Sequence, residues 1–580
     1  MAILPDLLRM RAESTPAMAA VVVDGSSSLS FERWERRSNA FARGLARRGV
    51  RPGDPVLLVF DNSHLTDYAV AYVGVHKAAA VAVPVSSRIA APALEGILRQ
   101  CGAAAVIRPL DLGPCLQAPP LWGRAWHADP ATLEADHSIE EFQVPLAPGD
   151  RAEILYTSGT VGTRKGVSCS HEDITLDARP PVAERCPRAA TLFLHAFPPG
   201  TNAAQEGIRL PLRHGDKCGV VLPSFEPERF CQVICERGIS RLQLVPALAQ
   251  VILESGAPAR YDVTSIERVV LTGAPAPPAL LAKLADAFPR AAIWNSYTLT
   301  EAAQARTIMR YDGTRAGSVG RPDAGTEVRV ADAVGVDLPP GQTGEIWLRR
   351  AGGPQRHYHD DPEATSAAFV DGWLRTGDLG YLDTDGYLYL VDRKDDVIVS
   401  GGSKISCIEV EAVLAEHPAV VEAAVFSLPH GVLGHAVAAA AAVRSHVEVA
   451  SLRSFVRRRL GDIEAPQQIL LVERLPRNQS GKVLKDDLRR AMLNAPAPVP
   501  IGLAEGATQI AIRSMWQEVL GVEQVGPDDD FFDQGGHSLA ASRVLSRIEE
   551  QLGVRLAVTA IFDCPTVAAL SAAVDRARRG

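Results

Sequence analysis

The sequence predicts an α/β fold, with a large N-terminal domain of layered sheets and helices, a small α+β domain, and a C-terminal helical bundle. Three observations predict this class. From about residue 15 to 350, apolar strand-like runs alternate with amphipathic helical stretches, which favours mostly parallel sheets. Short alternating strands joined by Asp-Gly turns then indicate a small antiparallel sheet. About seventy residues with helical periodicity follow a proline-rich spacer.

The large domain begins with strand–helix pairs. PVLLVF (55–60) precedes a helical region at 66–78, and AVAVPV (80–85) precedes the helical ALEGILRQCG. Strands joined through helices pair in parallel, so these runs predict one parallel sheet. Further runs of the same kind are AAAVIRP (103–109), RLQLVP (241–246) and RVVLTG (268–273).

The pattern changes near the end of the large domain. GQTGEIWLRR (341–350) and DGWLRTGDLGYLDTDGYLYLVDR (371–393) are short alternating strands with Asp-Gly turns, which predict antiparallel pairing. We therefore place the large domain at 1–393 and a smaller α+β unit at 394–492.

A spacer and a helical unit follow. The spacer, 493–507, contains NAPAPVPIGLAEGA with three prolines at alternate positions, which favours an extended, semi-rigid linker. The unit at 508–580 contains IAIRSMWQEVLGV, SLAASRVLSRIEEQLGV and TVAALSAAV. Their helical periodicity predicts a small bundle.

Composition excludes several classes of protein. A chain of 580 residues is too long for one core and predicts two to four domains. It is 47% hydrophobic and 22% charged, which is typical of a soluble globular protein. A net charge of −8 with dispersed Lys and Arg argues against a nucleic-acid partner.

Targeting and redox signals are equally plain. The N-terminal MAILPDLLRMRAESTPAMAA has no basic segment followed by an unbroken apolar run, so we expect no signal peptide. The apolar window 68–85 is interrupted by His76, Lys77 and Pro84, which argues against a membrane span. The nine cysteines are scattered without a CxxC, and Cys231 with Cys235 has no second pair nearby, which favours reduced core thiols over zinc. We expect a cytoplasmic protein.

The stretch YTSGTVGTRKGV (156–167) suits a polyphosphate. Its glycines let backbone N–H groups approach an anion, its hydroxyls offer hydrogen bonds, and Lys165 adds charge. It is not a Walker loop, because Lys165 precedes Gly166 instead of Ser or Thr, and the kinase GxGxxG spacing also fails. A plain glycine-rich turn is the competing interpretation.

Three further motifs point to one family. They are NSYTLTE (295–301), RTGDLGYLDTDGYLYLVDRKDD (375–396) and LPRNQSGKVLK (475–485). With the glycine-rich stretch, in this order and at these separations, they resemble the adenylate-forming superfamily over about residues 10–490. That group includes acyl- and aryl-CoA ligases and the adenylation domains of nonribosomal peptide synthetases.

The resemblance implies ATP and Mg²⁺ and assigns roles to matching positions. The residues implied for the β- and γ-phosphates are Thr157, Ser158, Gly159, Thr160, Gly162 and Lys165. Those implied for adenine and ribose are Gly273, Ala274, Pro275, Tyr297, Asp378 and Arg393. Those implied for catalysis are Thr300 at the α-phosphate, Glu301 at Mg²⁺ and Lys482 at the reacting centre, with Asp395 as the hinge of the small subdomain.

Each role has a plainer competitor when taken alone. Tyr297 suits a half-buried aromatic position, Asp378 suits a turn, and Lys482 suits the surface; the order of the motifs is what favours the functional interpretation. The chain also departs from the family pattern at three positions: Arg164 replaces a usual Pro, Thr298 replaces a usual Gly, and Asp392 replaces a Gly usual in peptide-synthetase domains. None of these changes removes a charged group, and Thr298 is expected to narrow the acid pocket.

The implied chemistry needs cations. A carboxylate must attack the α-phosphate, and two unit charges about 4 Å apart repel by about 4 kcal/mol at an effective dielectric of about 20. Mg²⁺, Lys165 and Lys482 would offset this repulsion where charge builds up. The acyl-adenylate must then be shielded from water.

The segment DDDFFDQGGHSLA (528–540) resembles the phosphopantetheine attachment site of carrier proteins. Ser538 would carry 4′-phosphopantetheine, and His537 completes the GGHSL typical of peptidyl carriers. The competing interpretation makes Ser538 a simple helix cap. Flanking WQEVLGV and AIFDCPTVAAL fit the carrier pattern.

The acid is the least determined feature. In LFLHAFPPGTNAAQEG (192–207), the position of the Asp that pairs with an α-amino acid falls on Ala196 or on Asn202, depending on the alignment. An unpaired buried ammonium costs about 3–5 kcal/mol, so we favour an aryl or small acyl acid. A β-amino acid served by Glu206 and a standard α-amino acid stay as alternatives. The predicted pocket residues are His195, Ala196, Phe197, Gly200, Thr272 and Ser296.

The leading hypothesis is a loading enzyme that forms an acyl-adenylate and transfers the acyl group to its own carrier. The small subdomain would turn at Asp395 and withdraw Lys482, and the strand near Gly401-Gly402 would line the thiol tunnel. Expected partners are a small carboxylic acid, a phosphopantetheinyl transferase, and a downstream acyltransferase, condensation or polyketide synthase protein. A free acyl-CoA ligase and an inactive scaffold or carrier-docking protein are the alternatives, and the need for an auxiliary activating protein stays open.

Overall fold

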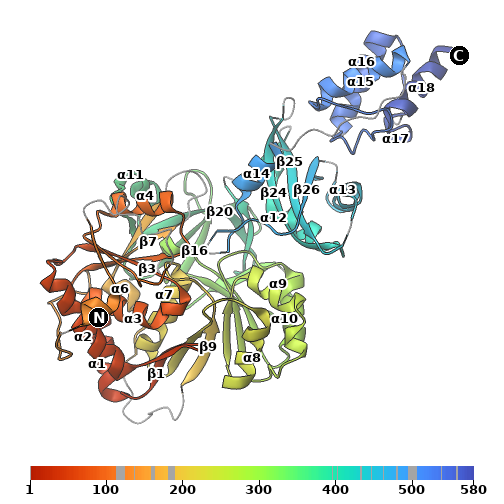
Figure 1. The fold of residues 1–580 in the computed structure, drawn as a ribbon. Coiled ribbons are helices and arrows are strands. Elements are labelled where there is room, and N and C mark those ends of the chain that lie inside the picture. Colours follow the sequence, from red (N-terminus) through yellow and green to blue (C-terminus); the bar gives the residue numbers. More distant parts are fainter. Residues whose placement is uncertain are drawn as a thin grey trace. The chain divides into compact units, whose positions relative to one another are not determined.

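A computed structural model describes the chain as two compact units (Figure 1). The first comprises Met1–Thr376, Gly380–Leu390 and Asn478–Lys482, and the second Gly377–Leu379, Val391–Arg477 and Val483–Gly580. The described residues are 2–579 except 113–124, 136, 158–163, 180–189, 303, 316, 395, 401–402, 431–433, 446, 462, 479–480, 494–505, 537 and 557–559. The predicted α/β class is confirmed.

One sheet contains the first predicted parallel pair. Strand β3 (Pro55–Phe60) lies parallel to β4 (Val81–Ser86), with Leu57 opposite Val83, as the alternation of apolar runs and helices requires. The strand order is β18-β8-β7-β4-β3-β5-β6. The other strands are β5 (Ala105–Ile107), β6 (Trp126–Ala128), β7 (Arg151–Thr157), β8 (Lys165–Ser170) and β18 (His357–Tyr358).

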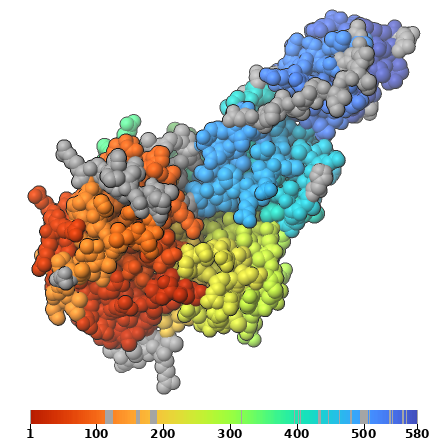
Figure 2. Space-filling model, in the orientation of Figure 1, coloured from red at the N-terminus to blue at the C-terminus, as the bar shows by residue number. Residues whose placement is uncertain are grey.

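A second, longer sheet runs β16-β17-β20-β21-β15-β14-β13-β12-β11-β9-β10-β1-β2, with β19 beside β20. Its stretch from β13 to β1 is parallel, and β14 pairs antiparallel with β13 and β15. The residues with Asp-Gly turns also pair antiparallel, as predicted: β17 with β16, β20 with β19 and β21 with β15. Figure 2 shows the red N-terminal segment and the yellow segment of this unit as one continuous surface, consistent with β1 joining β10. The strands are β1 (Ala19–Val23), β2 (Ser27–Ser30), β9 (Thr191–His195), β10 (Lys217–Val221), β11 (Arg241–Leu244), β12 (Arg268–Leu271), β13 (Ala292–Tyr297), β14 (Thr307–Arg310), β15 (Ser318–Pro322), β16 (Thr326–Ala331), β17 (Gly344–Arg350), β19 (Phe369–Val370), β20 (Trp373–Leu382) and β21 (Leu388–Arg393).

The helices of this unit form where one apolar face meets a sheet or another helix. Helix α2 (Phe31–Arg47) begins at Ser30, whose hydroxyl accepts from the Arg33 N–H at 3.3 Å, and it buries Trp34 against α3 (Leu65–Lys77). The other helices are α1 (Leu4–Ser14), η1 (Asn62–His64), α4 (Ala91–Cys101), α5 (Pro130–Glu134), α6 (His171–Ile174), α7 (Asn202–His214), α8 (Pro227–Arg237), α9 (Pro246–Glu254), η4 (Ala257–Ala259), α10 (Pro278–Ala287), η5 (Thr300–Ala302) and α11 (Pro362–Ala368).

The charged residue inside the apolar window 68–85 has partners. This window forms most of α3 and β4, and Lys77 is buried with its Nζ 2.6 Å from Glu35 Oε1 and 2.6 Å from Asn39 Oδ1. A buried ammonium is tolerated when it is paired in this way. In the part of the chain that the structure describes, no helix has the length and apolar character needed to cross a membrane.

Most of the described cysteines belong to the core. All seven that the structure describes are free, and five of them are buried. Burial raises the pKa of these thiols, Cys101 to about 11 and Cys231 to about 12, which keeps them protonated.

His64 is a pH-sensitive contact near the end of β3. Its ring lies 2.7 Å from Asp61 Oδ1 and 3.0 Å from Asp111 Oδ1, and the hydrogen bond to Asp61, followed by that to Asp111, raises the pKa of His64 to about 9. A histidine with a raised pKa stabilises the fold fully below its unfolded pKa of about 6.5, and this contribution is lost as pH rises through about 9.

We therefore expect a His64→Gln variant to unfold more easily than the wild type at pH 6 but not at pH 9.5. The rise in the pKa of His64 corresponds to a loss of about 3 kcal/mol at most in the free energy of unfolding at pH 6. Solvent around the partly exposed ring reduces this loss to about 1–2 kcal/mol. Thermal unfolding of both proteins at the two pH values measures the difference. An equal difference at both values would show that the charge of His64 does not contribute.

The second unit contains the predicted small α+β domain and helical bundle. The described strands of its sheet run β23-β22-β25-β24, with β26 parallel to β25. These elements are β22 (Ile398–Ser400), β23 (Ser403–Ile405), β24 (Val420–His430), β25 (Gly434–Val443), β26 (Gln468–Val472), α12 (Cys407–Ala415), α13 (Val449–Arg457) and α14 (Lys485–Leu493). Most of the predicted spacer, 494–505, lies outside the described residues.

The predicted bundle at the C-terminal end is also confirmed. Its helices are α15 (Ala507–Leu520), α16 (Ser538–Leu552), α17 (Ala560–Asp563) and α18 (Val567–Arg579). They enclose their own apolar core, in which Trp516 packs edge-on against Phe531 with ring centroids 4.9 Å apart.

Candidate active site

A β-hairpin carries the residues that flank the glycine-rich stretch. Strand β7 ends at Thr157 and its antiparallel partner β8 begins at Lys165, so the two residues lie opposite each other. The Thr157 hydroxyl lies 3.5 Å from the Lys165 carbonyl oxygen. The predicted phosphate-binding residues Ser158, Gly159, Thr160 and Gly162 lie outside the described residues.

The base of this hairpin is tightly packed, and its cation rests on an aromatic ring. A Cβ at Gly166 would lie 2.8 Å from Ile154 Cγ2 and 3.1 Å from the Tyr156 ring, so only glycine fits. The Lys165 Nζ lies 4.8 Å from the centre of the Tyr358 ring. A cation–π contact of this kind restrains an ammonium group while leaving its donors available.

The residues predicted for adenine lie at the carboxyl ends of two neighbouring parallel strands. Because β12 pairs with β13 and Leu271 lies opposite Asn295, the Thr272–Gly273 turn lies beside Ser296 and Tyr297. Gly273 has φ +85°, a conformation that favours glycine, and the Tyr297 ring is buried at 9% exposure. The carboxyl ends of parallel strands are where ligands bind in open α/β sheets.

The predicted catalytic pair follows directly after β13. Thr300 and Glu301 lie in the single turn η5. The Tyr358 hydroxyl donates to Glu301 Oε1 at 3.3 Å, and the Arg356 guanidinium donates to the Thr300 carbonyl oxygen. Glu301 offers the carboxylate oxygen that Mg²⁺ prefers, and Lys165 belongs to the same unit, so this donor set fits a magnesium-bound polyphosphate.

Four of the predicted acid-binding residues, His195, Ala196, Phe197 and Gly200, lie between the end of β9 and the start of α7, whereas Thr272 and Ser296 lie at the ends of β12 and β13. The His195 ring stacks between Phe193 and Phe197, with centroids 6.0 and 5.7 Å away, and burial lowers the pKa of His195 to about 4. His195 is therefore neutral at pH 7, with its Nδ1 accepting from the Phe197 N–H at 3.3 Å. This wall of the site is apolar and uncharged.

Two glycines near the predicted acid pocket, Gly200 and Gly207, allow close contact between neighbouring segments of the chain. A Cβ at Gly207 on α7 would lie 2.6 Å from His195 Nε2, so glycine lets the helix close on β9. Gly200 has φ +89°, and a Cβ there would lie 3.0 Å from the Pro84 carbonyl oxygen. Ala196, between these buried residues, is half-buried.

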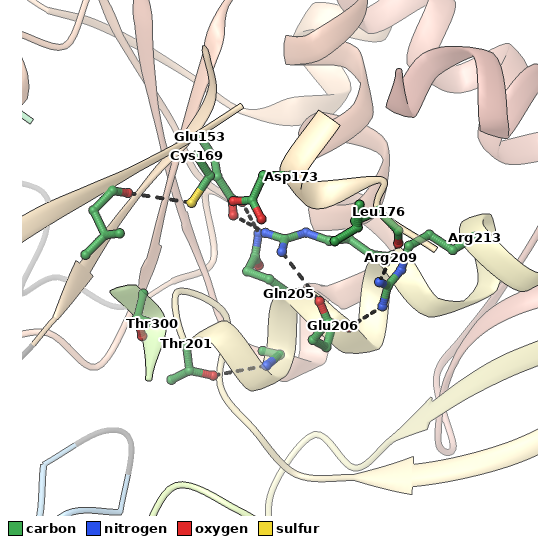
Figure 3. A network of polar contacts seen from close by, with 12 residues as sticks. Glu153, Cys169, Asp173, Leu176, Thr201, Gln205, Glu206, Arg209, Arg213 and Thr300 are labelled. Carbon is green, nitrogen blue, oxygen red and sulfur yellow. Dashed lines mark hydrogen bonds and ion pairs between the residues drawn. The ribbon is translucent and has the colours of Figure 1, made fainter. Parts of the chain in front are cut away.

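Glu206, the candidate partner for a substrate amino group, is already paired. It forms an ion pair with Arg213, and the Arg209 guanidinium lies 3.6 Å from Glu206 Oε1 (Figure 3). Burial alone would raise the pKa of Glu206, but Arg213 and Arg209 hold it below its ordinary value. Arg209 also pairs with the fully buried Glu153. The negative charge of Glu206 is thus balanced by arginines of the protein itself.

The predicted ribose residues meet in the second unit. Arg393, at the end of β21, places its Nε 3.0 Å from Asp378 Oδ1 in β20. The neighbouring Asp392 is buried and accepts from the N–H groups of Arg393 and Cys407, at 2.7 and 2.5 Å. Burial raises the pKa of Asp392 to about 6. The predicted hinge Asp395 and the Gly401-Gly402 pair lie outside the described residues.

Lys482 belongs to the first unit and is hydrogen-bonded through its backbone to Asn478. The Lys482 N–H donates to Asn478 Oδ1 at 2.8 Å, and the Asn478 N–H donates back to the Lys482 carbonyl oxygen at 2.8 Å. Gly481 has φ +81°, and a Cβ there would lie 3.3 Å from the Val245 side chain. Val245 packs against Phe197, one of the residues predicted for the acid pocket, so Gly481 lies near that predicted pocket.

Ser538 is the first residue of α16, and Gly535 and Gly536 lie shortly before it in the chain. Gly535 has φ +89°, and a Cβ at Gly536 would lie 2.3 Å from the Phe531 ring, so both positions require glycine. Gly536 therefore lets the backbone pack against Phe531 two positions before α16 begins.

Sequence reasoning missed Arg356, Tyr358 and Asp173. Arg356 and Tyr358 belong to an Arg-His-Tyr run between two predicted strands, and this run alone does not indicate a functional site. Arg356 and Asp173 are 183 positions apart in the chain, so their pairing has no local pattern.

Comparison with known proteins identifies three regions. The AMP-binding enzyme family model matches residues 8–357, the AMP-binding enzyme C-terminal domain matches 409–482, and the phosphopantetheine attachment site matches 511–574. Long-chain-fatty-acid–CoA ligase FadD13 of Mycobacterium tuberculosis is 31% identical over 506 residues, 83% of this chain and 97% of that protein. Phosphinothricin tripeptide synthetase PhsC of Streptomyces viridochromogenes is 29% identical over 95% of this chain and 51% of its own length.

A solved structure agrees with this assignment. O-succinylbenzoate Coenzyme A synthetase (MenE) of Bacillus subtilis, in complex with ATP and magnesium, superposes with a TM-score of 0.72 at 25% identity, covering 83% of this chain and 99% of that one. The matched regions account for the large domain, the small domain and the bundle. The family implies ATP and Mg²⁺, and the attachment site implies covalent 4′-phosphopantetheine. The chain belongs to the AMP-binding enzyme family, as an AMP-forming adenylation enzyme fused to its own phosphopantetheine carrier domain.

Proposed function

We propose that this enzyme activates an aryl or small acyl acid without an amino group and transfers the acyl group to phosphopantetheine on its own Ser538. The product would be loaded into a nonribosomal peptide or hybrid pathway. The observation that carries the choice of acid is the state of Glu206, which is neutralised by Arg213 and Arg209. Neither Ala196 nor Asn202 supplies another carboxylate. A buried substrate ammonium without a counter-ion costs about 3–5 kcal/mol.

The proposed adenylation step depends on positioned charge. Thr157, Lys165 and the glycine-rich stretch would hold the polyphosphate, Glu301 would hold Mg²⁺, and Asp378 with Arg393 would hold the ribose. When bound, Mg²⁺ neutralises charge on the polyphosphate. Lys482 would stabilise the charge that develops as a carboxylate oxygen bonds to the α-phosphorus and pyrophosphate leaves. Neutral His195 and its aromatic neighbours would keep water from the mixed anhydride.

The second step transfers the acyl group to sulfur. The phosphopantetheine thiol attacks the acyl carbon, AMP leaves with the electron pair of the broken C–O bond, and a thioester remains on the arm. A tethered carrier raises the effective concentration of this thiol to about millimolar. Fusion of the carrier domain supports transfer in cis.

A free acyl-CoA ligase is the second candidate. The similarity to FadD13, named as a CoA ligase, favours this candidate and covers 83% of the chain. The carrier domain at 511–574 favours transfer to the protein instead. Competition between CoA and the loaded carrier for the acyl-adenylate separates the two.

A panel of acids should distinguish the substrate classes. We expect pyrophosphate exchange with aryl or small acyl acids to exceed exchange with the matched β-amino and α-amino acids by at least about 10²-fold, because about 3–5 kcal/mol separates them. Exchange supported by α-amino acids alone would contradict the proposed acid class.

The carrier domain requires a phosphopantetheinyl transferase to attach the arm. We propose that the loaded acyl group is collected by a separate acyltransferase, condensation or polyketide synthase protein. Intact mass of the primed protein, incubated with ATP and the best acid, should show one acyl group per arm.

A further inference from the structure

The short strand β18 lies beside the β7–β8 hairpin, which carries Lys165. It pairs antiparallel with β8, with His357 opposite Ser168 and Tyr358 opposite Val167. The His359 N–H donates to the Gly166 carbonyl oxygen at 2.7 Å, so the pairing reaches the residue next to Lys165. Side chains of β18 therefore have a fixed position relative to the start of β8.

Arg356 connects this strand to the catalytic turn η5. Its side chain is buried at 1% exposure, and its Nε lies 2.6 Å from Asp173 Oδ2, which is equally buried. A second nitrogen of the same guanidinium donates to the Thr300 carbonyl oxygen. Burial alone would lower the pKa of Arg356, but Asp173 raises it above the ordinary value, so the group stays charged. A charge-assisted bond to a backbone oxygen restrains the main chain there.

Tyr358 contacts two charged groups of the site at once. Its hydroxyl donates to Glu301 Oε1 at 3.3 Å, and its ring face receives the Lys165 Nζ at 4.8 Å from the centroid. Glu301 is the proposed magnesium ligand and Lys165 the proposed polyphosphate cation. One side chain thus sets the distance between the two groups that would neutralise the polyphosphate.

We propose that Arg356 and Tyr358 are positioning residues that hold Thr300 and Glu301 in register with Lys165 for Mg²⁺-dependent nucleotide binding. This rests on the proposed roles of Lys165 and Glu301. Arg356 fixes the backbone of η5, and Tyr358 orients the Glu301 carboxylate and the Lys165 ammonium. Neither residue is expected to contact the reacting atoms. Preorganised groups of this kind matter because small displacements of charged ligands weaken metal and phosphate binding.

The affinity for ATP tests this without an acid substrate. We would measure Kd by titration calorimetry with Mg²⁺ and with excess EDTA. Tyr358→Phe removes only the hydroxyl, so we expect about fivefold weaker binding with Mg²⁺ and less than about twofold change in EDTA. Tyr358→Leu also removes the ring under Lys165, so binding should weaken about threefold further, in both conditions. Tyr261→Phe, in an apolar cluster of the same unit, is the matched control.

A double variant tests Arg356 without leaving the buried Asp173 charge unpaired. Arg356→Met with Asp173→Asn removes both charges, and we expect about tenfold weaker ATP binding with Mg²⁺ in a protein that still melts cooperatively. If it does not fold, the Tyr358 variants decide alone. The proposal would be overturned if Tyr358→Phe bound ATP with wild-type affinity, or if its binding weakened equally with Mg²⁺ and with EDTA. It would also be overturned if the folded double variant bound ATP with wild-type affinity. A wild-type protein that binds no ATP would instead remove the proposed function, and this proposal with it.

Discussion

A Ser538→Ala variant will activate its acid at the wild-type rate and carry none of it. Ser538 begins α16 in the carrier bundle, whereas the proposed adenylation residues Lys165, Thr300 and Glu301 lie in the first unit, which has its own core. Pyrophosphate exchange should therefore stay within about twofold, because no group near the acid or the nucleotide changes. Intact mass after treatment with a phosphopantetheinyl transferase should show neither the arm nor an acyl group.

Ser546→Ala is the matched control, since Ser546 is an exposed serine on the same helix. That variant should be primed and loaded like the wild type. Acyl mass on Ser538→Ala would show that another residue carries the thioester. Loss of exchange in Ser538→Ala would show that the carrier affects adenylation itself.

A Lys482→Ala variant will lose adenylate formation by about 10²–10³-fold, the cost of removing one group that stabilises developing charge in a transition state. The hydrogen bonds between Lys482 and Asn478 described above use the backbone atoms of Lys482, so truncating its side chain keeps them. Exchange kinetics with the best acid measure the loss. Lys283→Ala, an exposed lysine on α10, should have no effect.

Supplying the acyl-adenylate separates the two half-reactions. If Lys482 acts in adenylation alone, primed Lys482→Ala will still load synthetic acyl-adenylate onto Ser538 at close to the wild-type rate. Exchange within about threefold of wild type would contradict the role of Lys482. Loss of transfer from supplied adenylate would place Lys482 in both steps.

The site could be predicted as far as its residues lie in contiguous motifs. Thr157 and Lys165 flank one hairpin, and Thr300 follows Tyr297 by three positions, so short stretches of sequence carry both pairs. The order of strands, the Asp-Gly turns and the helical bundle were predictable for the same reason: period and turn chemistry are local properties. The roles given to these residues stay predictions.

The choice of acid could not be read in the same way. From the sequence, Glu206 was an available carboxylate for a β-amino group. In the folded chain the Glu206 carboxylate is instead paired with Arg209, about one turn further along α7, and with Arg213, about two turns further along it. Arg209 in turn is held by Glu153 from β7, 56 positions earlier, and this pairing exists only when α7 packs against that sheet.

The sequence by itself determined the family and the carrier domain, and it predicts the two half-reactions and Ser538 as the attachment residue, because each of these features lies in a run of adjacent residues. Only the tertiary structure decided which charges neutralise one another: Arg356 with Asp173, Lys77 with Glu35, and Glu206 with two arginines. The physical reason is that burial strengthens the interaction between charges and makes an unpaired charge costly, and neither burial nor proximity across the fold is a property of neighbouring positions in the chain.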